Sequence, residues 1–184
     1  MHLNNSRRLA GWIALVGAAQ FLLVLAYSEY SYPGFSFQNT FISDLGVGKT
    51  AVLFNASLIV AGAAMALVAL LGFYVEGHLL ASFFVFLDAL AIIGVGAFPE
   101  NTGFLHEFFS HSAFFLGGVI AVASGKYAEP PLSYFCILMG GISLLSAALF
   151  TQGVTLGLGK GGIEHLIVIP FLLWAMAFGR HLSS

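Results

Sequence analysis

This 184-residue sequence has very little charge, because Asp, Glu, Lys and Arg together make up only 8% of it. Water-soluble domains carry about 25% charged residues, so a chain this poor in charge cannot cover a surface that faces water. The net charge of −2 and the lack of a basic patch give no reason to expect a nucleic-acid partner. These absences exclude soluble enzymes and nucleic-acid-binding modules, and they favour an integral membrane protein.

Cysteine and recognisable catalytic signatures are also scarce. Cys136 is the only cysteine, so an intramolecular disulfide and a cysteine-based zinc site are excluded. The zinc-binding patterns HExxH and HxxxH are missing, and so are the phosphate-loop patterns GxxxxGKS and GxxxxGKT. The glycine-rich residues 152–162 follow an apolar run rather than a strand, which favours a flexible loop that gates a pocket over a phosphate-binding loop.

Apolar residues, in contrast, make up 59% of the chain and are gathered into six long runs. A helix of about 20 apolar residues spans the hydrocarbon core of a bilayer, and each run approaches or exceeds that length. No internal repeat or soluble domain is evident. We therefore predict an all-α integral membrane protein in which residues 1–184 form one bundle of six transmembrane helices, at residues 9–26, 51–75, 79–98, 103–124, 132–151 and 163–179.

The connections between these runs are short, with one exception. The turn Glu76-Gly77-His78 is typical of them, whereas residues 27–50 form a much longer first loop. Within that loop, residues 35–45 are predicted to form a short amphipathic helix on the membrane surface, which Gly46 and Gly48 would end.

Basic residues predict the orientation of the bundle, because cytoplasmic loops carry more Lys and Arg than extracytoplasmic ones. With the N-terminus inside the cell, the basic residues on the cytoplasmic side are Arg7, Arg8, Lys126 and Arg180, against Lys49 and Lys160 outside. The sequence therefore predicts a multi-pass protein of the cell membrane with both termini in the cytoplasm.

Polar residues converge on the extracytoplasmic end of this predicted bundle. The densest stretch is FPENTGFLHEFFSH at 98–111, a polar turn between two apolar runs. Ionisable groups are costly in a membrane, so a cluster of them at one turn is the first place to look for function. Three loops and four helices contribute to a predicted outward-facing pocket: Ser43, Asp44, Asn55, Glu100, His106, Ser110, His111, Glu164 and His165.

Asp88 lies apart from this cluster, in the middle of the third predicted helix. A carboxylate at that depth suggests a function and is expected to face the interior of the bundle. The alternative is a protonated carboxyl group that hydrogen-bonds with a neighbour, such as Gln20 of the first helix, and serves only packing. The sequence leaves both interpretations open.

The leading functional hypothesis is a metal-dependent hydrolase that acts on a lipid or another amphiphile. Imidazole and carboxylate donors together suit zinc, and the candidate ligands are His106, His111 and His165. The metal would acidify a bound water, with Asp44 or Glu100 as a further ligand or as the general base. Ser43, next to Asp44, is a further candidate catalytic residue.

Three other interpretations remain open. Two histidines on neighbouring helices, of which His111 and His165 are the best pair, would ligate a b-type haem in an electron-transfer protein. A serine hydrolase is less favoured, because adjacent pairs such as Ser43-Asp44 and Ser110-His111 do not make a triad. The third interpretation is a non-catalytic binding or structural subunit of a membrane complex.

Five phrases occur in an order and spacing that resemble a known family of membrane proteins. They are ISDLG (42–46), LFNASLI (53–59), GAFPE (96–100), HEFFS (106–110) and GGIEHLIVIPFLLWAMAFG (161–179). The family is catalogued as domain of unknown function 998 and is best represented in archaea. The resemblance covers nearly the whole chain, and it implies a six-helix membrane protein without an established activity.

The resemblance also implies which polar residues recur in the family, at Ser43, Asp44, Asn55, Glu100, His106 and Glu164. The residue after the last glutamate is often basic in the family, whereas here it is His165, and His111 also departs from the pattern. These departures weaken haem ligation as a family-wide function. A looser similarity in residue types links the chain to the ceramidase and adiponectin-receptor superfamily of membrane zinc hydrolases, whose HxxxH pattern is missing here.

Overall fold

The computed structural model describes residues 2–74 and 77–184, and within them it contains helices and turns but no strand. Six of the helices are long and apolar enough to cross a membrane, as the sequence predicts. They are α1 (His2–Ser31), α2 (Ala51–Val68), α3 (Leu79–Ala97), α4 (Phe104–Ser124), α5 (Leu132–Thr151) and α6 (Gly159–Ser183). The chain is therefore an all-α, multi-pass membrane protein.

The observed helix bounds depart from the predicted ones mainly at the two chain ends. α1 takes in the polar residues before the first apolar run, and α6 begins at Gly159, so the end of the glycine-rich stretch is helical rather than a loop. α2 continues as a π-helix from Ala69 to Tyr74. The predicted end of the second helix at Val75 and the turn residue Glu76 lie outside the described residues.

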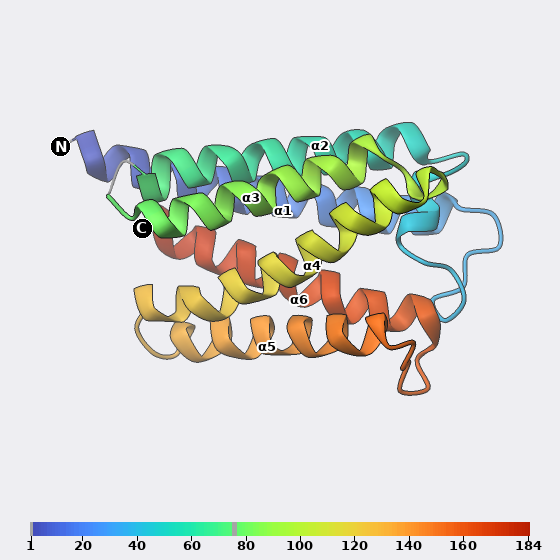
Figure 1. Cartoon of the computed structure of the whole chain (residues 1–184). Coiled ribbons are helices and arrows are strands. Elements are labelled where there is room, and N and C mark those ends of the chain that lie inside the picture. The colour runs from blue at the N-terminus through green and yellow to red at the C-terminus, as the bar shows by residue number, and fades with distance from the viewer. Residues whose placement is uncertain (1, 75–76) are drawn as a thin grey trace.

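The helices lie roughly side by side, with both termini at one end of the bundle (Figure 1). The first loop and the starts of α4 and α6 lie at the opposite end, which we call the loop end (Figure 1). α4 crosses the bundle diagonally, from beside α3 at the loop end to beside α5 at the other end (Figure 1). Polar residues that are far apart in sequence are therefore brought together at the loop end.

Glycines permit the close approach of neighbouring helices. A side chain at Gly62 of α2 would meet the backbone of α3 at Ala89, and one at Gly140 of α5 would meet the backbone of α4 at Val122. Small residues at such contacts are the usual way in which membrane helices pack closely, because lipid gives no hydrophobic force between helices. Large apolar side chains such as Leu23 and Val52 remain on the outside, which fits a lipid bilayer as the surrounding medium.

The first loop does not contain the predicted helix over residues 35–45. It consists of turns with local backbone hydrogen bonds, followed by one short 3₁₀ helix, η1 (Ser43–Gly46), and it also bonds to α6. The Gly161 N–H donates to the Gln38 carbonyl at 3.2 Å, and the Ile42 N–H donates to the Glu164 carboxylate at 2.6 Å. These contacts use the Gln38 carbonyl and the Ile42 N–H, groups that a continuous helix would pair internally, so the segment is held in turns against α6. We call residues 36–46 the strap.

Candidate active site

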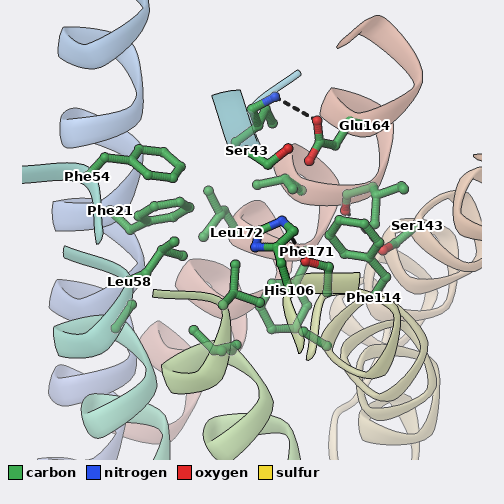
Figure 2. Close-up of a pocket in the computed structure, with 18 residues that line it drawn as sticks. Phe21, Ser43, Phe54, Leu58, His106, Phe114, Ser143, Glu164, Phe171 and Leu172 are labelled. Atoms are coloured by element: carbon green, nitrogen blue, oxygen red, sulfur yellow. Dashed lines mark hydrogen bonds between the residues drawn. The ribbon is translucent and has the colours of Figure 1, made fainter. Parts of the chain in front are cut away.

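An apolar cavity of about 110 Å³ lies inside the bundle near the loop end. All six long helices and the strap contribute to its wall, for example Phe21 of α1, Ile92 of α3 and Ser143 of α5. Figure 2 shows Phe21, Phe54 and Leu58 on one side of the cavity and Phe114 and Phe171 on the other. The wall therefore suits the hydrocarbon part of a ligand.

A second and more polar cavity of about 210 Å³ adjoins the first, and we call it the acidic chamber. It is lined by Phe41, Ser43, Glu100, His106, Glu107, Ser110, His111, Phe114, Phe150 and Glu164. Five residues line both cavities and form what we call the shared wall: Ser43, His106, Ser110, Phe114 and Glu164. An amphiphile with its chain in the apolar cavity would thus place its polar part against these five side chains.

His106 and Ser110 form a hydrogen-bonded pair in the shared wall. They are one turn apart on α4, and both are buried, with 7% and 8% exposed. His106 Nδ1 lies 2.8 Å from the Phe98 carbonyl oxygen, which can only accept, so Nδ1 carries a proton. In the neutral ring the lone pair is then on Nε2, 3.1 Å from the Ser110 hydroxyl. This arrangement orients a base toward a potential nucleophile.

Glu164 holds the strap against the shared wall. Its carboxylate accepts the hydrogen bond from the Ile42 N–H, and the next residue in the strap is Ser43 (Figure 2). Glu164 is only 5% exposed, so a buried hydrogen bond to its carboxyl group holds the residue next to Ser43 in place. The Ser43 hydroxyl is in this way presented to both cavities.

Glu100 lines the chamber, and the carboxyl group of Asp44, which lines neither cavity, interacts with it. Burial, followed by hydrogen bonding with Asp44 and the charge of Asp44, raises the pKa of the Glu100 carboxyl above its usual value of 4.5. A hydrogen bond with the Ser43 side chain and the positive charge of Lys160 both lower the pKa of Glu100, but by less. Asp44 also accepts a 2.7 Å hydrogen bond from the Phe41 N–H, which closes the turn that leads into η1.

The other two histidines of the predicted metal site lie in different surroundings from each other. His165 lines neither cavity, and its Nδ1 and Nε2 lie 2.7 Å from the Gly161 carbonyl and the Glu29 carboxylate. His111 faces the chamber but is exposed, and its Nδ1 donates to the Glu107 carbonyl of its own helix. Among the described residues, no three or more His, Cys, Asp or Glu side chains are grouped so as to hold a metal ion.

Asn55 and Asp88 lie outside both cavities. Asn55 of α2 donates from its side-chain amide to the Gly46 carbonyl at 2.9 Å, so it anchors the end of the strap. Asp88 is fully buried, as expected for a residue that faces the bundle interior. The suggested partner Gln20 donates to the Ser57 carbonyl instead, and neither Asp88 oxygen has a hydrogen-bond partner among the described residues.

Some residues at the site were not singled out in the sequence. Glu29, which pairs with His165, lies just after the predicted first span, in the phrase YSEYS, and only the extension of α1 to Ser31 places it on a helix. Phe41, Phe114 and Phe150 line the chamber, but nothing distinguishes them from the other 16 of the 19 phenylalanines before the chain is folded.

Comparison with known proteins gives a family but no described activity. No curated protein and no solved structure matches the chain. A family model described as "Protein of unknown function (DUF998)" matches residues 15–181, and this span contains both cavities and the whole strap. The chain therefore belongs to this family of membrane proteins of unknown function.

Proposed function

We propose that this protein is a membrane hydrolase that cleaves an ester of an amphiphile, with Ser110 as nucleophile and His106 as general base. The observation that carries the proposal is the position of this hydrogen-bonded pair in the wall shared by an apolar cavity and a polar one. The hydrocarbon chain would occupy the apolar cavity, and the scissile bond would lie against the shared wall.

The reaction follows from the tautomer of His106. Ser110 Oγ would attack the ester carbonyl carbon while its proton passes to His106 Nε2 and then to the leaving alcohol. The acyl group would remain on Ser110 until a water, deprotonated by His106, attacks it and releases the free acid. Ser43, which lines both cavities and hydrogen-bonds with Glu100, would turn its hydroxyl to the oxyanion that develops on the carbonyl oxygen.

The metal-dependent form of the hydrolase and the haem protein both stay predictions. In the metal-dependent form His106 would bind a metal ion instead of acting as a base, and Asp44 or Glu100 would be a further ligand or the general base. A haem between His111 and His165 would require His165 to give up its bond to Glu29. A visible spectrum and elemental analysis of the purified protein test these two versions directly.

The orientation of the protein is part of the proposal. The basic residues favour cytoplasmic termini, and in the fold the termini lie at the end opposite the loop end (Figure 1). The cavities lie near the loop end. The active site would then receive its substrate from the outer leaflet of the cell membrane or from outside the cell.

A covalent probe tests the proposed nucleophile. Purified protein in detergent would be treated with a long-chain alkyl fluorophosphonate, which modifies activated serines, and in parallel assayed with p-nitrophenyl acyl esters. We expect Ser110 to carry the label, and we expect Ser110→Ala and His106→Gln each to lower hydrolysis on the order of 100-fold or more.

The matched control is Ser112→Ala, because Ser112 lies on the same helix but lines neither cavity and donates to the Phe108 carbonyl. Its activity and labelling should equal those of the wild type. Full hydrolysis by a correctly folded Ser110→Ala variant would overturn the serine mechanism, and loss of hydrolysis on treatment with a chelator would favour the metal-dependent form.

A further inference from the structure

The acidic chamber has aromatic walls. Phe41 of the strap, Phe114 of α4 and Phe150 of α5 all line it, although they come from three different elements. Phe150 makes edge-on contacts with both of the others, with ring centroids 5.8 Å from Phe41 and 6.0 Å from Phe114. The Phe150 ring is thus set at a steep angle to both of the others around one cavity.

One of these rings already receives a cation. The Lys160 ammonium lies 4.1 Å from the centroid of the Phe41 ring. The face of an aromatic ring carries negative potential and attracts ammonium groups at this distance. Lys160 is exposed and is not among the residues that line the chamber, so this contact is made from outside the cavity.

The charges inside the chamber have the matching sign. Its wall includes the carboxyl groups of Glu100, Glu107 and Glu164, whereas no lysine or arginine is among the described residues that line it. Burial and the neighbouring carboxyl group of Asp44 raise the pKa of Glu100, because both disfavour its charged form. A ligand that carries positive charge would relieve this repulsion, and a ligand that carries negative charge would add to it.

We propose that the acidic chamber binds the ammonium headgroup of a cationic amphiphile whose hydrocarbon chain extends into the adjacent apolar cavity. That this amphiphile is a substrate rests on the proposed hydrolase activity, whereas the binding of its headgroup in the chamber does not. Aromatic faces together with carboxylates recognise quaternary ammonium groups in particular, because such groups are poorly hydrated and cannot be held by ordinary hydrogen bonds.

Binding is best measured in the Ser110→Ala variant, so that turnover does not interfere. The probes are dodecyltrimethylammonium, dodecanol and dodecyl phosphate, which share one chain and differ in headgroup charge. Each is titrated by calorimetry into protein in a non-ionic detergent. We expect the cationic probe to bind about tenfold more tightly than dodecanol, and dodecyl phosphate to bind more weakly than both.

Two variants assign the preference to the chamber. Phe150→Leu should remove most of the advantage of the cationic probe over dodecanol, and Phe150→Tyr, which keeps the ring, should retain it. Phe115→Leu is the matched control, because Phe115 is exposed on α4 and lines neither cavity. A melting curve for each variant checks that it is folded.

The outcomes separate this inference from the proposed function. Tighter binding of dodecyl phosphate than of dodecyltrimethylammonium would overturn the cationic headgroup, and so would an unchanged preference in folded Phe150→Leu. The wild type could hydrolyse neutral and cationic esters at equal rates and bind them with equal affinity. This result would support the proposed hydrolase activity and contradict the preference for a cationic headgroup. Selective binding of the cationic probe without hydrolysis of any ester would support the headgroup site and reject the hydrolase.

Discussion

At the scale of single residues, the site depends on which groups are hydrogen-bonded to which. His106 hydrogen-bonds with a backbone carbonyl through Nδ1 and with the Ser110 hydroxyl through Nε2. In the neutral ring the proton is therefore on Nδ1, and the lone pair of Nε2 points at the hydroxyl. His165 has both nitrogens committed to protein partners, one of them the Glu29 carboxylate. Two residues of the same type therefore differ in the chemistry that they offer, and only His106 has a nitrogen directed at a reactive group.

The raised pKa of Glu100 predicts how the stability of the protein depends on pH. Its pKa is raised in the folded protein above the usual value of 4.5, so the folded state holds this proton more tightly than the unfolded state does. The stabilising contribution is therefore fully present below pH 4.5 and is lost as the pH rises through the raised value.

We expect Glu100→Gln, which cannot lose a proton, to melt progressively higher than the wild type as the pH is raised across this window. Melting curves of both proteins in the same detergent and buffers measure the difference, in which the titration of all other groups largely cancels. A constant difference at every pH would mean that Glu100 titrates alike in the folded and unfolded states.

At the scale of elements, the strap and the start of α6 form one unit. The Glu164 carboxylate and the Gly161 N–H hold the strap by hydrogen bonds, and the Phe37 ring packs on His165 at 4.4 Å between centroids. Gly161 is needed for this contact, since a Cβ at that position would collide with the Thr40 carbonyl. The glycine-rich stretch that the sequence predicts to be a flexible gating loop thus includes Gly161, which is closely packed against the strap.

A substitution at Gly161 tests this unit. We expect Gly161→Ala to push the strap away from α6, to lower the free energy of unfolding by about 1–3 kcal/mol, and to lower hydrolysis because Ser43 is displaced. The control is Gly141→Ala in α5, where a Cβ has nothing within 4 Å. That change should be neutral or stabilise by up to about 1 kcal/mol, because alanine is the better helix former. Equal melting curves for the two variants would refute a close-packed strap.

At the scale of the whole molecule, the diagonal path of α4 connects the polar loop end with the bundle interior. Its first turns carry His106 and Ser110, and further along the helix Phe114 reaches the apolar cavity (Figures 1 and 2). Because all six helices line that cavity, it exists only when the full bundle is assembled. The site is thus a property of the whole chain rather than of one motif.

The proposed orientation of the whole molecule can be measured with a membrane-impermeant maleimide on intact cells. We expect Lys49→Cys, at the loop end, to be labelled, and Lys126→Cys, at the other end, to be labelled only after the cells are opened. Both lysines are exposed, and the native Cys136 is fully buried and should give little background. The reverse pattern of labelling would place the site on the cytoplasmic side.

Much of the fold could be predicted from the sequence because membrane spans are a local property. The length and hydropathy of each run limit it to a helix that crosses the bilayer. α3, α4, α5 and α2 with its π-helical end agree with their predicted limits within a few residues, whereas α1 and α6 extend beyond theirs. The strap is the exception, since the helical pattern of residues 35–45 is overridden by bonds to α6. Local propensity decides a segment only where no distant partner competes for its backbone.

The sequence by itself determined the class of the protein, its six spans and the family to which it belongs, because each of these follows from residues that are close together in the chain. Only the tertiary structure decided which polar residues share a cavity. The Glu29–His165 pair joins residues 136 apart, and the Ile42–Glu164 bond joins residues 122 apart. Hydropathy carries no information about such pairings, because they depend on how the helices cross and rotate against one another.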